Sequence, residues 1–267
     1  MVTFFSYNFL SKYKEVILSE EMEKQLLKEI EELRKKVNIL EGVDENSIPI
    51  YQFSKMTHSI LKKHLSIKKN LDDTIFDRWF NKNYKIDNET INFFQELIND
   101  NYKLIASYNE EDLKINFIAP ILNKVHFKSY ENEFREFYEL PLRYETDKFI
   151  FNGTTDFVVS KGLVESEKPY FFIQEFKKGQ QDGYPEPQLL AELISGVELN
   201  GYEEIKGAYI VGAFWYFVIL HKLSDGKYQY FVSKSFDSMR IEDLREIYTH
   251  LLYVKDEILN KIITKSV

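Results

Sequence analysis

The chain has 267 residues, of which 44% are hydrophobic and 16% aromatic, enough to bury one substantial core and a smaller helical subdomain. It contains no cysteine, which excludes disulfides, zinc–thiolate sites and cysteine nucleophiles. The formal net charge of −8 is unlike that of a general nucleic-acid coat protein. It still allows an acidic cluster that binds metal and local basic patches that bind phosphate.

The first residues predict neither a signal peptide nor a membrane span. Apolar side chains between Phe4 and Leu10 are followed at once by Lys12 and Lys14, so no apolar core of sufficient length forms. We therefore expect a cytoplasmic protein that has no membrane partner. The five histidines are scattered without zinc-helix spacing, which leaves hard oxygen ligands as the expected metal site.

Residues 1–105 are predicted to form a mainly helical N-terminal region, because apolar positions recur every three or four residues. Ser19 is the expected N-cap of a helix with one narrow apolar stripe. The stripe consists of Leu26, Ile30, Leu33, Val37 and Leu40. An ordinary amphipathic helix is favoured over a coiled-coil arm, since the repeat is not sustained over enough heptads.

A second helix is predicted from Tyr51 to Ile67, and it carries the most basic run of the chain. Such a run can contact a phosphate backbone, which makes Lys62 and Lys63 candidate substrate-binding residues. The alternative, which the position at a helix end favours, is a group of solvated cations near the negative helix pole.

Residues 106–267 are predicted to form an α/β domain with a mixed β-sheet flanked by helices. A helix from 86 to 105 precedes it, and Asn109 is expected to cap its first helix. Short aromatic and β-branched segments predict strands, and two further helices are expected at 185–199 and 241–263. The predicted strands are 134–144, 149–159, 169–177, 207–214, 216–222 and 228–236.

The strand 169–177 carries the most informative pair of charges. With a side-chain period of two, Glu175 and Lys177 share the face that buries Phe171 and Ile173. Both faces of the strand begin apolar, which predicts a central position in the sheet. A carboxylate and an ammonium on such a face are costly without a metal, a mutual pair or water.

The preceding strand contains one acid, Asp156. If the two strands are antiparallel neighbours, Asp156 and Glu175 converge at one edge of the sheet. Two adjacent carboxylates repel each other unless a divalent cation neutralises them, and Mg²⁺ does this with oxygen ligands while keeping several waters. Phosphodiester hydrolysis needs carboxylates for the metal and a cation near the developing charge, a role that Lys177 fits.

Asp156 followed by Glu175-Phe176-Lys177 on the next strand resembles the PD-(D/E)XK nuclease superfamily, with Thr155 in place of the proline. The resemblance implies a restriction-endonuclease-like fold and a Mg²⁺ or Mn²⁺ ion held by Asp156, Glu175 and Phe176. The helix that begins at Asn109 is similar to the opening helix of the nuclease domain in type I restriction endonuclease R subunits. It implies an additional catalytic acid, Glu110, with Glu111 as the alternative.

The resemblance extends over residues 107–236 and includes the predicted helix 185–199. Gln188 matches a family glutamine and, with Lys178, is a candidate for substrate binding. Glu192 stands where the family often has tyrosine, which is a departure from the family's pattern on the DNA-facing side of this helix. The stretch 207–217 is similar to the late strand pair of these domains.

The sequence therefore predicts a metal-dependent nuclease that hydrolyses DNA, in a role such as restriction or defence. The second hypothesis is a catalytically silent member that uses the same fold to bind DNA or a protein. A third is a subunit active only in a larger machine, since no phosphate-binding helicase loop accompanies the site. The expected partner is nucleic acid, DNA first, and both a homodimer and a partner subunit are compatible with the sequence.

Overall fold

The computed structural model describes residues 22, 25–26, 29, 48–179 and 184–265. Contacts divide the chain into two units, Met1–Ile48 and Pro49–Val267. In the first unit five residues are described: four of them, among them Leu26, are helical and exposed, and the fifth is Ile48, whereas Ser19 and the rest of the predicted stripe lie outside the described residues. The boundary predicted near residue 105 separates a helical N-terminal region from an α/β domain, and this division stays a prediction.

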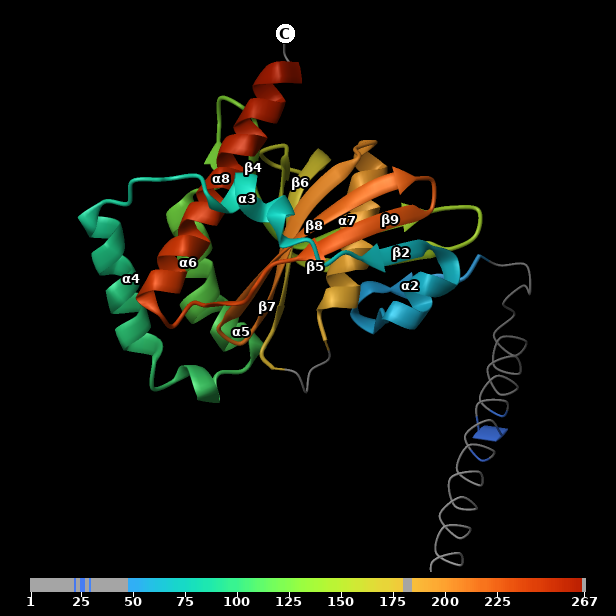
Figure 1. Ribbon diagram of the computed structural model, residues 1–267, viewed down its shortest axis with the longest axis horizontal. Coiled ribbons are helices and arrows are strands. Elements are labelled where there is room, and N and C mark those ends of the chain that lie inside the picture. The colour runs from blue at the N-terminus through green and yellow to red at the C-terminus, as the bar shows by residue number, and fades with distance from the viewer. Residues whose placement is uncertain (1–21, 23–24, 27–28, 30–47, 180–183, 266–267) are drawn as a thin grey trace, which may run out of the picture. The chain divides into compact units, whose positions relative to one another are not determined.

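The second unit is an α/β structure built on a large mixed sheet (Figure 1). The strands follow the order β2-β9-β8-β7-β6-β5-β4-β3, with β1 beside β5 and β10 beside β8. The pairs β6–β7, β2–β9 and β1–β5 are parallel, and the other pairs are antiparallel. The strands are β1 (Ile50–Gln52), β2 (Ser66–Lys69), β3 (Lys128–Ser129), β4 (Phe134–Glu145), β5 (Ile150–Lys161), β6 (Glu167–Lys177), β7 (Glu204–Val211), β8 (Phe214–Ser224), β9 (Lys227–Val232) and β10 (Phe236–Asp237).

Helices cover both faces of this sheet (Figure 1). On one face a core cluster joins the sheet to α2 and α7, and on the other a larger cluster joins it to the remaining long helices. The α-helices are α2 (His58–His64), α3 (Asp77–Phe80), α4 (Asn88–Asn101), α5 (Glu110–Leu113), α6 (Ala119–Val125), α7 (Glu186–Asn200) and α8 (Ile241–Lys265). None of the helices in the described part of the chain has a stretch long and apolar enough to span a bilayer.

Most of the predicted elements are confirmed, including all the long strands and the helices α4, α7 and α8. The central position of β6, between β5 and β7, is also confirmed. The cap predicted at Asn109 is present as a capping box, in which its side chain accepts from the Asp112 backbone N–H at 2.8 Å.

The helix predicted from Tyr51 to Ile67 is wrong. The segment instead forms β1, a 3-10 turn (Phe53–Lys55), α2 and β2. Thr57 caps α2 with its side chain, and Leu65 ends it in an extended conformation at φ −133° and ψ 149°. Burial then alternates along β2, where only Ile67 is buried, because this short strand pairs with β9 at the edge of the sheet.

The predicted facing of β6 is correct for Ile173 and wrong for Phe171. Phe171 joins the core cluster of Phe172, on the face opposite Ile173. The register explains the change, since Tyr170 pairs with Ser160 while Phe172 pairs with Val159, which leaves Phe171 as an extra residue in a β-bulge. The bulge lies before Ile173, so the alternation toward the end of the strand is undisturbed.

Candidate active site

The two predicted acids lie on neighbouring antiparallel strands. Phe157 of β5 pairs with Gln174 of β6, and continuing this register by one residue sets Asp156 opposite Glu175. The backbone N–H of Phe176 donates to Asp156 Oδ2 at 2.8 Å, which fixes that carboxylate against β6. The neighbours in the same alternation, Val158 and Ile173, belong to the core cluster of α7. Both acids therefore lie on the face that α7 covers.

Glu175 is a buried acid with poor compensation. Its residue is 1% exposed, and neither carboxylate oxygen has a hydrogen-bond donor in the described structure. Lys177 Nζ lies 2.8 Å from Oε1, although not in hydrogen-bond geometry. Burial and the nearby Asp156 carboxylate raise the pKa of Glu175 well above its ordinary value, and Lys177 opposes the shift only in part.

Lys177 connects the strand acids with helix α5. Its ammonium lies 2.8 Å from Glu175 Oε1 and 3.6 Å from Glu110 Oε1. Burial alone would lower the pKa of Lys177, yet the adjacent acids, Glu175 first, raise it above its ordinary value. Lys177 is therefore held in its charged form beside Glu175.

Glu110 reaches the group from the first turn of α5. Burial raises the pKa of Glu110, and the charge of Lys177 works against this shift. Glu111, the alternative acid, is 68% exposed and contacts Lys114 at 3.4 Å. Of the two, Glu110 is the one within 4 Å of a predicted site residue, in accord with the first choice from the sequence.

Lys114 is a site residue that the sequence reasoning missed. Its side chain is 8% exposed, and its ammonium lies 3.1 Å from Asp156 Oδ1 and 2.6 Å from Glu139 Oε1. Burial opposes its charge, but the hydrogen bond with Glu139 and the charge of Asp156 raise the pKa of Lys114 above its ordinary value. In the core of the site the two adjacent carboxylates, Asp156 and Glu175, are therefore flanked by one lysine on each side, Lys114 beside Asp156 and Lys177 beside Glu175.

A signal for Lys114 was present in the sequence. Position 114 falls on the same helical stripe as Phe117, Ile118 and Ile121, all of which are buried. A lysine at a core position needs a partner for its charge. The backbone around it also departs from a regular helix, because Lys114–Ile118 form a π-helical turn, a feature that often lies at functional sites.

Helix α7 closes the site with two further polar side chains. Gln188 is 7% exposed and donates from Nε2 to Glu192 Oε1 at 3.1 Å. Glu192 is fully buried, and its Oε2 has no partner among the described residues. Burial and then the charge of Glu175 raise the pKa of Glu192 well above its ordinary value. The predicted glutamine therefore lies beside the site, bound to the residue that departs from the expected pattern.

The carboxylates of Asp156 and Glu175 are hard oxygen ligands of the kind that a divalent cation uses, although both Asp156 oxygens already accept hydrogen bonds, from Lys114 and from the Phe176 N–H. Two buried carboxylates lie on the same face of neighbouring strands, and both oxygens of Glu175 lack hydrogen-bond donors in the described part of the chain. Across the same residues, no three acidic or histidine side chains are grouped closely enough to enclose a metal. An ion bound by this pair would depend on water for its remaining ligands, which is how Mg²⁺ is usually held.

The other predicted residues are distributed around this group. Phe176 contributes its backbone N–H to Asp156, while its ring is buried in the opposite core cluster. Lys178 is exposed at the end of β6. Lys62 and Lys63 are exposed on α2, outside the cluster of ion pairs described above. The structure therefore brings together Asp156, Glu175, Lys177 and Glu110, with Gln188 next to them.

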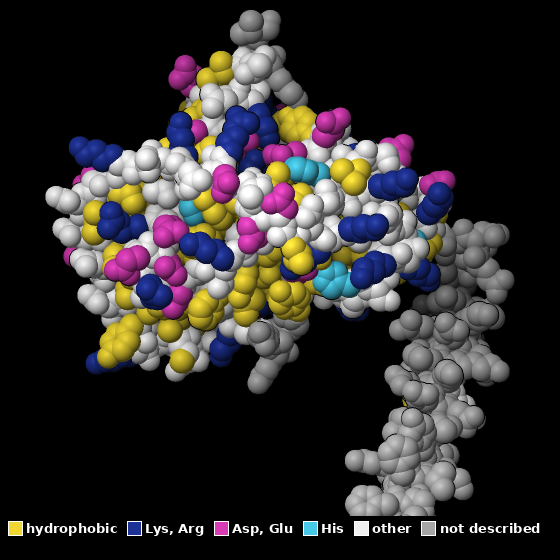
Figure 2. Space-filling model, viewed as in Figure 1, with side chains coloured by type: hydrophobic (Ala, Val, Ile, Leu, Met, Phe, Trp, Pro, Cys, Tyr) yellow, Lys and Arg dark blue, Asp and Glu magenta, His cyan; other side chains and the backbone are white. Residues whose placement is uncertain are grey.

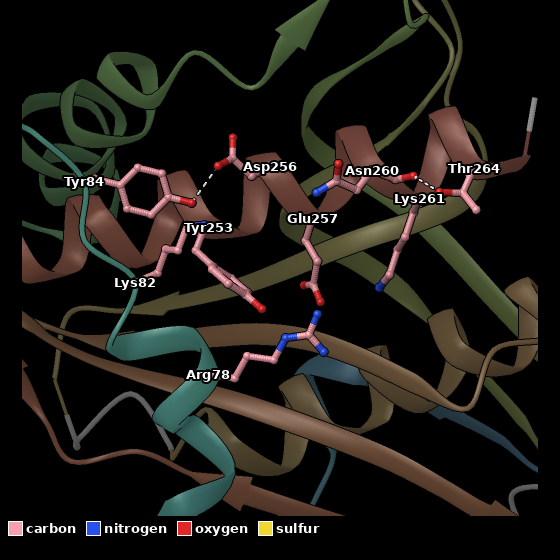
Figure 3. Close-up of a pocket in the computed structure, with 9 residues that line it drawn as sticks. All are labelled: Arg78, Lys82, Tyr84, Tyr253, Asp256, Glu257, Asn260, Lys261 and Thr264. Atoms are coloured by element: carbon pink, nitrogen blue, oxygen red, sulfur yellow. Dashed lines mark hydrogen bonds between the residues drawn. The ribbon is translucent and has the colours of Figure 1, made fainter.

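A separate pocket of about 640 Å³ lies between the α3 region and the C-terminal half of α8 (Figure 3). Its two acids are engaged, since Asp256 accepts from Tyr84 at 2.7 Å and Glu257 pairs with Lys206 at 3.0 Å. Arg78 and Lys261 point into the pocket from opposite sides. None of the predicted site residues lines it, so the pocket is distinct from the candidate active site.

In comparisons with known proteins, no family model matches the chain and no curated sequence matches it.

Proposed function

We propose that this protein is a Mg²⁺- or Mn²⁺-dependent nuclease of the PD-(D/E)XK type that hydrolyses DNA phosphodiester bonds. The observation that carries the proposal is the pairing of Asp156 with Glu175 across adjacent strands, with Lys177 next to Glu175. The α/β sheet with helices on both faces supports the finer assignment to a restriction-endonuclease-like fold.

Each residue has a role that its position supports. Asp156 and Glu175 would hold the cation, together with Phe176 as the third member of the predicted ligand set, and the ion would supply Lewis-acid polarisation and water activation. Lys177, held charged by its neighbours, is placed to stabilise negative charge on the phosphate. Glu110 orients the Lys177 ammonium from the side of α5. Gln188 and Lys178 are the proposed substrate contacts nearest to this group.

The test is cleavage of plasmid and single-stranded DNA by the purified full chain during a titration of Mg²⁺ or Mn²⁺. The wild type is compared with Asp156→Asn and Lys177→Met, which keep side-chain volume while removing the charge. Glu89→Gln is the matched control, because Glu89 is 89% exposed on α4 and pairs only at 3.6 Å with Lys124. Cleavage that requires metal, persists in the control and disappears in both site variants supports the proposal.

One observation favours a second candidate, a nuclease-fold module that binds DNA or protein without cutting it. Both oxygens of Asp156 already have partners, Lys114 at Oδ1 and the Phe176 N–H at Oδ2. In such a module the Lys114 ammonium beside Asp156 would permanently supply the positive charge that a metal supplies in a nuclease. Calorimetry with Mg²⁺ separates the two functions: a folded protein that takes up no ion at millimolar concentration and cuts no substrate is the silent module.

A further inference from the structure

A group of lysines lies at the edge of the sheet, on α2, β2 and the turn before them. Residues 49–70 contain five lysines and neither Asp nor Glu, in a chain with a net charge of −8. We call this group the α2–β2 lysine patch, and its members are Lys55, Lys62, Lys63, Lys68 and Lys69. All five are exposed, and within the described part of the chain only Lys69 has an acidic partner within 4 Å. Figure 2 shows Lys and Arg side chains gathered over β2 and β9.

A buried acid connects the patch to helix α7. Glu186, the first residue of α7, is 3% exposed. Its carboxylate lies 3.1 Å from Lys69 Nζ and 3.3 Å from His58 Nε2, and it accepts from the Tyr230 hydroxyl at 2.9 Å. Because Lys62 follows His58 by one helical turn, it lies on the same face of α2 and extends the cationic surface away from Glu186.

The same helix leads from Glu186 to the candidate active site. Glu192, which interacts electrostatically with Glu175, follows Glu186 by six residues, a rise of roughly 9 Å along α7. The patch and the site therefore lie at neighbouring positions along one buried helix. The rise between Glu186 and Glu192 is short compared with the length of a DNA duplex, in which phosphates recur every few ångströms along both strands.

We propose that the α2–β2 lysine patch binds the phosphate backbone of double-stranded DNA, so that the duplex extends from the site over the surface toward α2. The inference rests on the proposed nuclease function. A duplex is favoured over a single strand because proteins that bind single strands offer aromatic rings for stacking on the bases. In residues 49–70 the aromatic side chains are instead buried or hydrogen-bonded. Phe53 is fully buried, and the Tyr51 hydroxyl is hydrogen-bonded to His64 Nε2 at 2.9 Å.

The experiment measures binding of a labelled duplex of about 30 bp to the full chain without metal, over salt from about 50 to about 200 mM. The test variant is Lys62→Gln/Lys63→Gln. The matched control is Lys82→Gln/Lys85→Gln, which removes two exposed lysines next to α3, on the opposite face of the sheet. Each lost phosphate contact lowers the slope of log K against log salt by about 0.9, so the test variant should lose up to about 2.

The control should keep the wild-type slope and affinity. An unchanged slope in Lys62→Gln/Lys63→Gln, or equal binding of a single strand with the same lysine dependence, would overturn the proposal. So would the absence of any duplex binding by the folded wild type. The two proposals fail separately. Duplex binding that depends on the patch, without metal-dependent cleavage, contradicts the proposed nuclease function and leaves the DNA-binding patch intact. Metal-dependent cleavage with an unchanged salt slope contradicts only the DNA-binding patch.

Discussion

Two buried lysines of this protein, Lys114 and Lys206, have the same side-chain exposure of 8% but belong to charge clusters whose acids are compensated to different degrees. Lys206 lies 2.6 Å from Glu204 and 3.0 Å from Glu257, and Glu204 is also paired with His221 at 3.0 Å. The hydrogen bond from His221, followed by the charge of Lys206, lowers the pKa of Glu204 to about 2. In this Lys206 cluster each charge is matched by its neighbours.

In the candidate active site, by contrast, the charges are compensated only in part. Lys114 and Lys177 supply two cations, but Glu175 has no hydrogen-bond donor among the described residues and its pKa is raised by burial and by Asp156. Fully buried Glu192 adds a further acid whose pKa is raised. Burial of charge is therefore common to both clusters, and incomplete compensation is what distinguishes the site. Such mismatch is expected where a protein holds groups ready for a ligand or a reaction.

The largest effect should come from Glu175→Gln, which tests whether Glu175 is less well compensated than the acids of the Lys206 cluster. We expect DNA cleavage to fall by about 10³-fold or more, because the loss of a metal ligand removes several kcal/mol of transition-state stabilisation. The metal-free protein should keep or gain stability, since the amide removes a charge that burial disfavours. Activity assays and urea unfolding of the same preparation measure both effects.

Glu204→Gln is the matched control for Glu175→Gln. It makes the same chemical change in the Lys206 cluster, and it should lower stability while leaving cleavage intact. If Glu175→Gln instead destabilises the protein as strongly as Glu204→Gln, then Glu175 is as well compensated as Glu204. The contrast between the two clusters would then be wrong.

The next effect is on stability alone. Lys206→Met should lower the free energy of unfolding by about 2–4 kcal/mol, because it leaves Glu204 and Glu257 without their shared cation. Urea denaturation with a constant m-value would measure it. Lys234→Met is the control, since Lys234 is 68% exposed and pairs with Glu246 at 3.5 Å. A change within the control's range would show that Lys206 is dispensable for folding.

The sequence predicted the long elements well because their patterns are local. The strands β4 to β9 and helices α4, α7 and α8 follow from periodicity, and the Asp156–Glu175 pairing follows from two adjacent strands. β1 and β2 were not predictable in this way. Each has three or four residues and is defined by a distant partner, β5 or β9.

Alternation along two strands predicted the centre of the site, and the family resemblance added Glu110 and Gln188 on helices. Asp156, Glu175 and Lys177 were found because the acids stand on apolar strands. Lys114 and Glu139 come from other elements, and their contacts depend on tertiary packing across 25 to 42 residues. A lysine on the buried stripe of a helix was nevertheless a usable signal, and it should be weighed as heavily as an acid in a strand.

Lys114→Met tests whether the cation beside Asp156 competes with a metal. Removal of the ammonium frees Asp156 Oδ1, so the Mg²⁺ concentration for half-maximal binding should fall by about tenfold. Calorimetric titration of the folded protein measures it. Lys124→Met, in α6, is the control because the one acid within 4 Å of Lys124 among the described residues is the exposed Glu89. A higher Mg²⁺ requirement would mean that Lys114 supports Asp156 and makes the site more like the Lys206 cluster.

The smallest effect is a pH dependence that belongs to the Lys206 cluster. Because the pKa of Glu204 is lowered from 4.5 to about 2, its ionised form stabilises the folded protein above pH 4.5, and this contribution is lost as the pH falls toward 2. The Glu204 side chain is 39% exposed, so solvent screening reduces the contribution to about 1 kcal/mol.

The measurement is the difference in unfolding free energy between the wild type and Glu204→Gln along a pH series. That difference isolates Glu204 from the other carboxylates, which titrate equally in both proteins. It should be constant above pH 4.5 and shrink toward pH 2, because protonated Glu204 and glutamine carry the same charge. A difference that stays constant over the whole range would mean that Lys206 and His221 do not favour the ionised acid. The Lys206 cluster would then be no better compensated than the candidate active site.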